Sequence, residues 1–465
     1  MCRYRKGYKF HERIVKRLDC TYACYAISHT TFFMVLWLQN SFRTHYIGQL
    51  SAGMDGTAVR LGGWVHETRE VGKIAFILLR DHTGIVQIVC KGGELMKFAK
   101  LPKESVISVT GTVKKNGEAK KGFEIVPSSI ENLNPLSTKI PFEVTGKVPA
   151  DIDVRLDNRQ IDLRRLETTA IFNIQSTILK AFGEFLRGRG FQEIRTPSIV
   201  EAATEGGADL FKIQYFEKQA YLAQSPQLYK QLAVIGGMDR VFMVAPVFRA
   251  EKHNTIFHLN EITQMDIEMG FADHNDAIGI LADVFYHILC AVVEENKHDL
   301  EVLGRDLKPE KPVIVSYRDA VEKLAAEGGR IRFGEDFSRA DEERICAIFG
   351  DAVIVKEYPI PVRAFYSMPS QSDKEVSNSF DLIYRGLEVS SGAQRIHIPE
   401  ILIDSIRSRG LDEKDFEFYI NAFREGAPPH AGWSLGLERL TMKITGMQNI
   451  RECALFPRDR ERLKP

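Results

Sequence analysis

The chain has 465 residues, enough for two or three domains, and its 44% hydrophobic and 27% charged content is ordinary for a globular protein. Its 62 Lys and Arg balance its 62 Asp and Glu, so any nucleic-acid contact must use a local patch rather than a basic overall charge. The seven cysteines are scattered without a CxxC pair, which argues against a disulfide framework or a structural zinc site. We therefore expect reduced thiols in a cytoplasmic protein, with no metal at Cys20 and Cys24.

Residues 1–42 form an N-terminal extension of unclear role. Residues 1–18 are basic and residues 21–39 are fairly apolar, which is the order of a signal peptide or membrane anchor. Ser28, His29 and several threonines interrupt the apolar run, so it meets the criterion for a membrane span poorly. We favour a tail and expect no membrane partner.

Residues 43–130 carry five β-rich segments separated by glycines and charged turns, and "DHTG" at Asp81–Gly84 is typical of a hairpin turn. Five short strands predict a small barrel of the OB-fold type, which commonly binds single-stranded nucleic acid through exposed aromatics. Phe76 and Gln87 fall on neighbouring predicted strands. The pattern alone places Phe76 in the barrel core.

Residues 131–168 mix prolines, charges and short apolar pieces without a period, and we interpret them as a hinge or linker. A helix follows, because apolar residues recur at helical spacing from Ile171 to Leu186, and Gly188 and Gly190 end it. β-like and helical segments then alternate to the C-terminus. Residues 169–465 are therefore expected to form a larger α+β domain.

The run "FRAEKHNTIFHLNE" at Phe248–Glu261 combines charge with a short polar loop. We expect a strand that ends in Arg249 and Glu251 on one face, a turn at "KHNT", and a returning strand from His258. Such an arginine can grip a phosphate or a carboxylate with two hydrogen bonds. Taken alone, the run is explained better by a surface ion pair between Arg249 and Glu251.

Other residues of the same domain favour a nucleotide site. Asp381, Glu388 and Ser391 offer the hard oxygen ligands that suit Mg²⁺ working with phosphates. Arg439 follows a turn that contains glycine and is expected at the start of a helix, where a phosphate can bind. The chain has neither GxxxxGK[ST] nor GxGxxG, so arginines and a metal ion would have to hold ATP.

These motifs together resemble the class II aminoacyl-tRNA synthetases, and within subclass IIb the aspartyl-tRNA synthetases of archaeal and eukaryotic type. Motif 1 matches "GFQEIRTPSIV", motif 2 the run described above and motif 3 "SLGLERL", while "ATEGGADLF" and "AQSPQLYKQ" are typical of aspartyl enzymes. The resemblance covers about residues 43–465. It implies an OB-fold anticodon-binding barrel, a catalytic domain built on an antiparallel sheet flanked by helices, and a homodimer.

The resemblance implies three overlapping sets of residues: catalytic, ATP-binding and Mg²⁺-binding. Arg249, Glu251 and Arg439 match catalytic residues. The ATP-binding set is Arg249, Ala250, Glu251, Phe257, His258, Leu259, Glu388, Gly436, Leu437, Glu438 and Arg439; the metal-binding set is Asp381, Glu388 and Ser391. Three positions depart from the family pattern: Phe257 replaces an arginine, Ile262 an aromatic residue and Ser434 a glycine. We expect Phe257 to weaken ATP binding, because it removes one cation.

The aspartate pocket can be argued from charge. Aspartate and asparagine have nearly the same shape, so a cationic pocket separates them by leaving its charge unpaired when asparagine enters. Lys230 and Arg395 match the family's cations. The resemblance implies that aspartate is bound by Glu205, Gln224, Ser225, Pro226, Gln227, Lys230, Arg249, Asp266, Ser391 and Arg395.

The resemblance further implies that the barrel binds the tRNA anticodon through Phe76, Gln87, Glu124, His66 and Lys120. His66 is typical of relatives that charge both tRNA(Asp) and tRNA(Asn), whereas Lys120 matches strict ones. We favour dual specificity, which would call for an amidotransferase partner. The alternatives are an asparaginyl-tRNA synthetase, a synthetase-like asparagine synthetase, and an OB-fold nucleic-acid-binding protein with a decayed catalytic domain.

Overall fold

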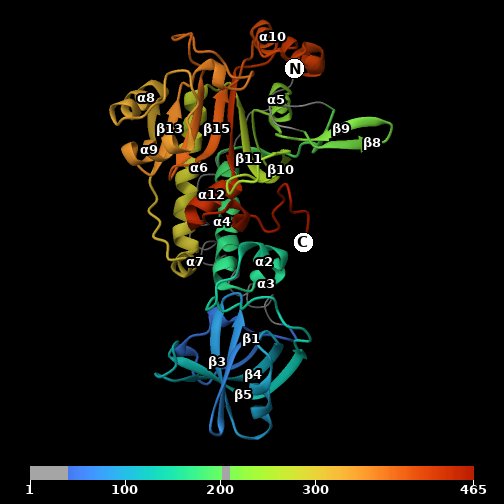
Figure 1. Cartoon of the computed structure of the whole chain (residues 1–465), viewed down its shortest axis with the longest axis vertical. Helices are drawn as coiled ribbons and strands as arrows, with labels where there is room; N and C mark the ends of the chain where they lie inside the picture. Colours follow the sequence, from blue (N-terminus) through green and yellow to red (C-terminus); the bar gives the residue numbers. More distant parts are fainter. Residues whose placement is uncertain (1–39, 202–209) are drawn as a thin grey trace, which may run out of the picture. The chain divides into compact units, whose positions relative to one another are not determined.

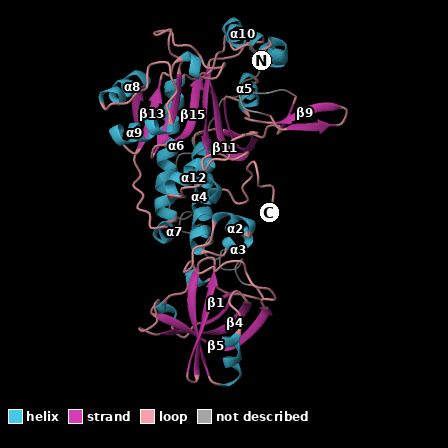
Figure 2. Cartoon of the chain, viewed as in Figure 1, coloured by secondary structure: helices cyan, strands magenta, loops and turns pink. Residues whose placement is uncertain are grey.

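The computed structural model describes residues 40–201 and 210–465. Most of the predicted N-terminal extension, with Cys20 and Cys24, lies outside the described residues, as does Glu205. The chain divides into two compact units at the peptide between Val154 and Arg155. Figure 2 shows strands dominating the first unit, whereas the second combines a large sheet with helices.

The first unit is a closed barrel with strand order β1-β2-β3-β5-β4, as the five β-rich segments predict. Its strands are β1 (Ala58–Val71), β2 (Ile74–Asp81), β3 (Gly84–Lys91), β4 (Val106–Lys115) and β5 (Phe123–Asn134). The predicted hairpin turn is present, because Asp81 pairs with Gly84 and its carboxylate accepts the N–H of Thr83 at 2.8 Å.

The barrel core corrects the pattern-based placement of Phe76. Ala75 and Ile77 are completely buried in the barrel, whereas Phe76 between them is only half-buried. Side chains alternate between the two faces of a strand, so Phe76 lies on the outer face. Its ring is covered there by the guanidinium of Arg69, 5.3 Å from the ring centroid. The apolar character of the strand had hidden this alternation.

The predicted linker contains regular structure. Strand β5 continues to Asn134, and helices α2 (Ile152–Asp157) and α3 (Arg159–Asp162) lie within residues 131–168. Arg159 is fully buried and donates to Asp162 at 2.6 Å and to the carbonyl of Leu455 at 3.0 Å. These helices are too short for a hydrophobic period to reveal them, and distant contacts hold them in place.

The second unit is built on an eight-stranded sheet with order β12-β13-β14-β15-β16-β11-β10-β6. Its strands are β6 (Gln192–Glu193), β10 (Arg240–Phe248), β11 (Glu261–Gly270), β12 (Val313–Ser316), β13 (Ala352–Lys356), β14 (Ser379–Tyr384), β15 (Glu388–Gln394) and β16 (His430–Gly436). The central pairs are antiparallel, as expected, but both edge strands pair in parallel, β6 with β10 and β12 with β13. The sheet is therefore mixed. Parallel neighbours require long crossover connections, and long stretches of chain separate β6 from β10 and β12 from β13. A small sheet, β7-β9-β8, comprises Ile199–Val200, Lys218–Leu222 and Lys212–Tyr215.

Helices cover one face of this sheet, and α4 and α6 run beside each other there (Figure 1). The helices are α4 (Leu166–Gly188), α5 (Gln227–Ile235), α6 (His274–Glu295), α7 (Lys297–Val302), α8 (Tyr317–Ala326), α9 (Arg339–Phe349), α10 (Pro399–Ser408), α11 (Glu417–Arg424) and α12 (Leu437–Thr445). α6 is long and apolar enough to cross a membrane by composition. Leu281, Phe285 and Ile288 are nevertheless fully buried in the core, which identifies α6 as a core helix.

Candidate active site

A row of polar side chains crosses the face of the sheet opposite α4 and α6. In register, Asp381 on β14 pairs with Ser391 on β15, Ser391 with Ser434 on β16, and Ser434 with Asp266 on β11. Residues directly opposite each other on neighbouring strands point to the same face. The next position along β16, Trp433, is fully buried among the apolar residues of the other face. The strand alternation thus separates a polar face from the core.

The hairpin between β10 and β11 brings in the predicted Arg249 and Glu251, but not on a strand. β10 ends at Phe248, and β11 begins at Glu261 rather than at His258. The N–H of Glu251 donates to the carbonyl of Arg249 at 2.8 Å, so the chain turns immediately. The side-chain amide of Asn260 donates to the same carbonyl at 2.8 Å and holds the turn.

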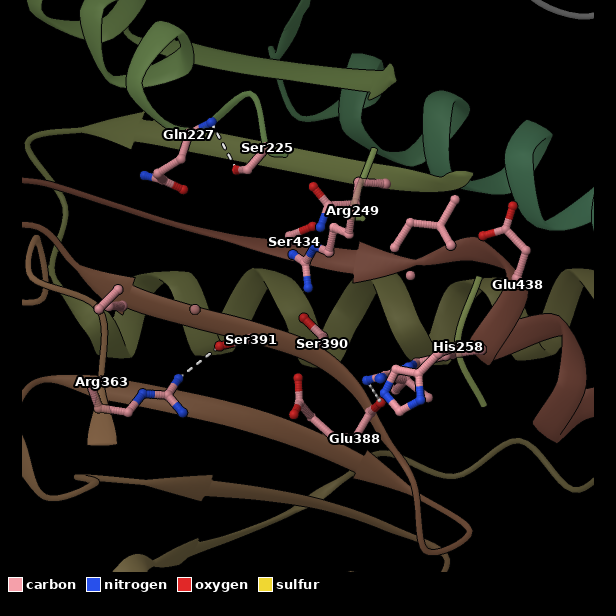
Figure 3. Close-up of a pocket in the computed structure, with 18 of the residues that line it drawn as sticks. Ser225, Gln227, Arg249, His258, Arg363, Glu388, Ser390, Ser391, Ser434 and Glu438 are labelled. Atoms are coloured by element: carbon pink, nitrogen blue, oxygen red, sulfur yellow. Dashed lines mark hydrogen bonds between the residues drawn. The ribbon is translucent and has the colours of Figure 1, made fainter. Parts of the chain in front are cut away.

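A cavity of about 330 Å³ lies over the polar row, and most of the predicted site residues line it. This volume is within the range of small-molecule sites. The predicted residues in its wall are Ser225, Gln227, Arg249, Glu251, Phe257, His258, Leu259, Glu388, Ser391, Arg395, Gly436, Glu438 and Arg439. Figure 3 shows Arg249 and Ser434 on one side and Glu388 and His258 on another. Gln224, Pro226, Lys230, Ala250, Asp266, Asp381 and Leu437 do not line it.

The two predicted cations of the aspartate pocket are buried and paired with carboxylates. The ammonium of Lys230 lies 2.7 Å from Asp266 Oδ1, 3.6 Å from Glu268 Oε2 and 3.2 Å from the carbonyl of Trp433. Arg395 donates to both oxygens of Glu268, at 2.9 and 3.2 Å. Burial alone would raise the pKa of Glu268, but Arg395 and Lys230 outweigh it and hold that pKa below its ordinary value. Two cations and two carboxylates thus form one buried network.

Uncharged side chains next to this network are hydrogen-bonded to one another. Gln231 on α5 accepts from the Tyr419 hydroxyl at 2.9 Å, and its amide nitrogen lies 2.8 Å from Nε2 of His430. Nδ1 of His430 lies 2.8 Å from the carbonyl of Pro428, so Nδ1 carries the proton and Nε2 accepts. Burial lowers the pKa of His430, which agrees with a neutral ring.

Two of the three predicted metal-binding residues, Asp381 and Ser391, bind an arginine that the sequence did not single out. Arg363 donates to both oxygens of Asp381, at 2.6 and 2.7 Å, and to the hydroxyl of Ser391 at 2.7 Å. Figure 3 shows Arg363 reaching Ser391 beside Glu388. Burial, followed by the charge of Asp381, raises the pKa of Glu388. Glu342 on α9 accepts the N–H of Glu388 at 3.3 Å, and burial followed by Glu388 raises its pKa to about 7.

The remaining wall contains the residues matched to ATP. Arg439, in the first turn of α12 as predicted, donates to the carbonyl of Glu388 at 3.0 Å. Both oxygens of Glu438 accept the N–H of Thr263, and burial raises the pKa of Glu438 to about 7. Burial, followed by Arg439, lowers the pKa of His258, so its ring is neutral near pH 7. Ile262 lines the same wall.

The predicted anticodon residues lie in the barrel. Gln87 and Glu124 are joined by a 3.4 Å hydrogen bond between β3 and β5, and Lys120 is exposed in the β4–β5 connection. His66 lies at a β-bulge, because the pairing of β1 with β2 shifts between Val65 and Glu67. Nδ1 of His66 lies 2.8 Å from Arg80, whose guanidinium also grips buried Glu104. Nδ1 therefore accepts, and Nε2 carries the proton.

Sequence reasoning missed several residues of the site, among them Glu268, Arg363, Glu342 and Gln231. Glu268 lies two residues after Asp266 on β11, so the period-two rule could have found it. Arg363 directly follows a short 3₁₀ segment, Ile360–Val362, while Glu342 lies on α9 and Gln231 on α5, and no local pattern links them to the site.

Known proteins share this architecture. The model for tRNA synthetases class II (D, K and N) matches residues 151–460, and the model for an OB-fold nucleic acid binding domain matches residues 59–133. The Aspartate--tRNA(Asp/Asn) ligase of Methanocaldococcus jannaschii is 47% identical over 91% of this chain and 98% of its own. The Thermoplasma volcanium relative, 45% identical over 90% of this chain and 99% of its own, is named Aspartate--tRNA(Asp) ligase.

A solved structure is similar throughout. Asparaginyl-tRNA synthetase from Pyrococcus horikoshii, complexed with asparaginyl-adenylate, matches with a TM-score of 0.85 and 33% identity, over 90% of this chain and 99% of that one. The match of both halves, in sequence and in fold, leads to one conclusion: the chain belongs to the class II aminoacyl-tRNA synthetases of the D, K and N group.

Proposed function

We propose that the protein is an aspartate–tRNA ligase, which activates L-aspartate with ATP and transfers it to the 3′ end of tRNA(Asp). The observation that carries this proposal is a pair of buried cations: Arg395 lines the cavity, and Lys230 contacts the same carboxylate, Glu268, without lining the cavity. The relatives named as aspartate–tRNA ligases support it.

The choice of aspartate over asparagine follows from the charges of the network. The substrate's α-ammonium is the natural partner of Asp266, which now holds Lys230. Once Asp266 binds the substrate, Glu268 alone balances Lys230 and Arg395, so one positive charge is left to pair with the side-chain carboxylate. Asparagine would leave a cation without its partner in a buried site, which costs several kcal/mol. This argument disfavours the asparaginyl-tRNA synthetase and the asparagine synthetase alternatives, and an intact network disfavours a decayed domain.

The site fits Mg²⁺ only in company with a nucleotide. Asp381 and Glu388 are neighbouring carboxylates, and burial followed by the charge of Asp381 raises the pKa of Glu388, so a bound cation would favour its ionised form. Among residues 40–201 and 210–465, no group of three His, Cys, Asp or Glu side chains is placed to hold a metal. Mg²⁺ typically takes one or two carboxylates and completes its shell with phosphates and water. Asp381, Glu388 and Ser391 would hold it, and it would neutralise phosphate charge.

The first step needs no general base, because the substrate carboxylate is already ionised at neutral pH. A carboxylate oxygen attacks the α-phosphorus, and the bond to pyrophosphate breaks. Arg249 and Arg439 both line the cavity; in this proposal Arg249 binds the α-phosphate, Arg439 binds the far end of ATP, and both supply charge stabilisation. In the second step a hydroxyl of the terminal adenosine attacks the aspartyl carbonyl, and AMP leaves.

We propose that the outer face of the barrel reads the anticodon, with Phe76 as a stacking surface and Gln87, Glu124, His66 and Lys120 beside it. The fixed Nε2–H of His66 offers a hydrogen-bond donor there. We further propose dual specificity for tRNA(Asp) and tRNA(Asn), a homodimer, an amidotransferase partner for the misacylated product, and a cytoplasmic location. The two relatives differ in tRNA specificity at nearly the same identity, so identity alone does not decide between the alternatives.

The test is charging of purified tRNA(Asp) and tRNA(Asn) with labelled aspartate. We expect the wild-type protein to charge both, and His66→Trp to lose tRNA(Asn) while keeping tRNA(Asp). Charging of tRNA(Asp) alone by the wild type would remove dual specificity but leave the ligase function. Failure to charge either tRNA with aspartate would contradict the proposed function.

A further inference from the structure

The cavity wall at Phe257 has a cation behind it. Phe257 lines the cavity next to His258 and is half-buried. The guanidinium of Arg339, the first residue of α9, lies over its ring, 4.5 Å from the ring centroid. An arginine within this distance of an aromatic face is held by a cation–π interaction. Phe257 thus fixes the position of a positive charge behind the cavity wall, because Arg339 itself does not line the cavity.

The hydrogen-bonding capacity of Arg339 is only partly used. Its Nε donates to Glu343 at 3.1 Å, but Nη1 lies 3.9 Å from Glu342, which is too far for a hydrogen bond. Nη1 is buried and has no hydrogen-bond partner among residues 40–201 and 210–465. A buried donor without a partner is costly in a folded protein and calls for an explanation.

Helix α9 is tied to the active site beside this donor. The carboxylate of Glu342, one turn after Arg339, accepts the N–H of Glu388 on β15. Glu388 and Arg439 both line the cavity, and Arg439 donates to the carbonyl of that same Glu388. Arg339 is therefore anchored near the wall by two independent contacts, the ring of Phe257 and the Glu342–Glu388 hydrogen bond.

Two of the arginines that line the cavity, Arg363 and Arg395, are already paired with the carboxylates of Asp381 and Glu268. His258 follows Phe257 in the wall, and its Nδ1 lies 2.6 Å from the hydroxyl of Thr255. Burial, followed by the charge of Arg439, lowers the pKa of His258, which favours a neutral ring. Arg249 and Arg439 line this part of the cavity, and the oxygens of a triphosphate can accept hydrogen bonds from more than two arginines.

We propose that Arg339, seated on the ring of Phe257, binds the terminal phosphates of ATP through Nη1. This inference rests on the proposed function, because it assigns a residue to the ATP site of that reaction. Arg339 compensates for the aromatic residue at position 257: when ATP binds, a shift of the Phe257 ring exposes Nη1 to the cavity, and a phosphate supplies the partner that this buried donor lacks in the free protein.

The experiment measures binding of ATP and of AMP to the full chain by calorimetry with Mg²⁺ present. Arg339→Ala should weaken ATP binding about tenfold, the usual effect of losing a charge-assisted hydrogen bond, and leave AMP binding unchanged. Arg339→Lys should retain part of the affinity. Arg344→Ala, an exposed arginine on the same helix, is the matched control and should not change either affinity.

Rescue distinguishes phosphate binding from a structural role. Phe257→Arg in the Arg339→Ala background should restore ATP affinity, because it returns a cation to the same place. Unchanged ATP affinity in Arg339→Ala, or equal losses for ATP and AMP, would overturn the inference while leaving the proposed function intact. Absence of ATP binding by the wild type would overturn both. Melting temperatures of all variants exclude unfolding as the cause.

Discussion

Arg363 and Asp381 form a buried, two-pronged ion pair in which each carboxylate oxygen accepts one guanidinium N–H, at 2.6 and 2.7 Å. Their side chains are 11% and 6% exposed, so water screens the pair little. Burial by itself would lower the pKa of Arg363, but Asp381 raises it. The net pKa is raised, so the guanidinium stays charged. Arg363 therefore binds the same carboxylate, Asp381, that Mg²⁺ would use. When Mg²⁺ binds, Asp381 must either contact both cations or release Arg363.

We predict that Arg363→Gln makes stability depend on Mg²⁺. Without the guanidinium, Asp381 is a buried charge lacking its partner, which costs about 3–5 kcal/mol in the free energy of unfolding. In EDTA, the melting temperature of the variant should be well below that of the wild type. Adding Mg²⁺ should raise the melting temperature of the variant by more than it raises that of the wild type. Arg318→Gln, which breaks an exposed pair with Asp373, is the control and should change little. An equal response of variant and wild type to Mg²⁺ would show that Arg363 does not compete for the site.

We predict that Lys230→Gln removes the preference for aspartate. Lys230 is 1% exposed and is paired with Asp266 and Glu268, so glutamine keeps much of the volume but not the charge. The kcat/KM for aspartate in ATP–pyrophosphate exchange should fall at least about 100-fold, because a polar group specific for the substrate is lost. The value for asparagine should change much less. Equal losses for both amino acids would instead point to general damage to the pocket.

Glu438 should make stability depend on pH. Burial raises its pKa to about 7, above the value of 4.5 expected in the unfolded chain. The folded protein therefore binds more protons between these values, so this contribution to stability is present below about pH 4.5 and lost as pH rises through about 7. Glu438→Gln should gain up to about 3 kcal/mol relative to wild type between pH 4.5 and 8 in urea unfolding. A difference that does not vary with pH would contradict this reading.

In the barrel, Arg80→Met should destabilise the first unit by about 3–5 kcal/mol, because buried Glu104 loses a bidentate partner. Adding Glu104→Leu should recover a large part of that loss, which a double-mutant cycle measures by chemical denaturation. Additive losses from the two substitutions would show that the pair is not coupled. Arg80→Met also removes the hydrogen bond to Nδ1 of His66. We therefore expect Arg80→Met to charge tRNA(Asn) less well, as we expect for His66→Trp.

The fold and much of the site were predictable where the signal was local. The five barrel strands and helix α4 follow from alternation and helical period, and the matched motifs led to Arg249, Glu388 and Arg439 in the cavity wall. Phe76 was misplaced because an apolar strand conceals which face is outward. Arg363 and Arg339 were missed because their partners, Asp381 and Phe257, lie far away in sequence.

The short helices α2 and α3 were missed for the same physical reason. Buried Arg159 organises them by binding carbonyl groups near residue 455, almost 300 positions along the chain. The early end of β10 at Phe248 depends on a turn that Asn260 completes from the other side of the hairpin. Tertiary contacts of this kind leave no period in the sequence.

ATP–pyrophosphate exchange, measured without tRNA and with aspartate and asparagine offered separately, tests the central claim most directly. Because buried Lys230 and Arg395 are proposed to bind the side-chain carboxylate of the substrate, we predict Mg²⁺-dependent exchange with aspartate and exchange with asparagine lower by at least about 100-fold. Exchange that prefers asparagine, or none with aspartate while ATP binds, would contradict the account.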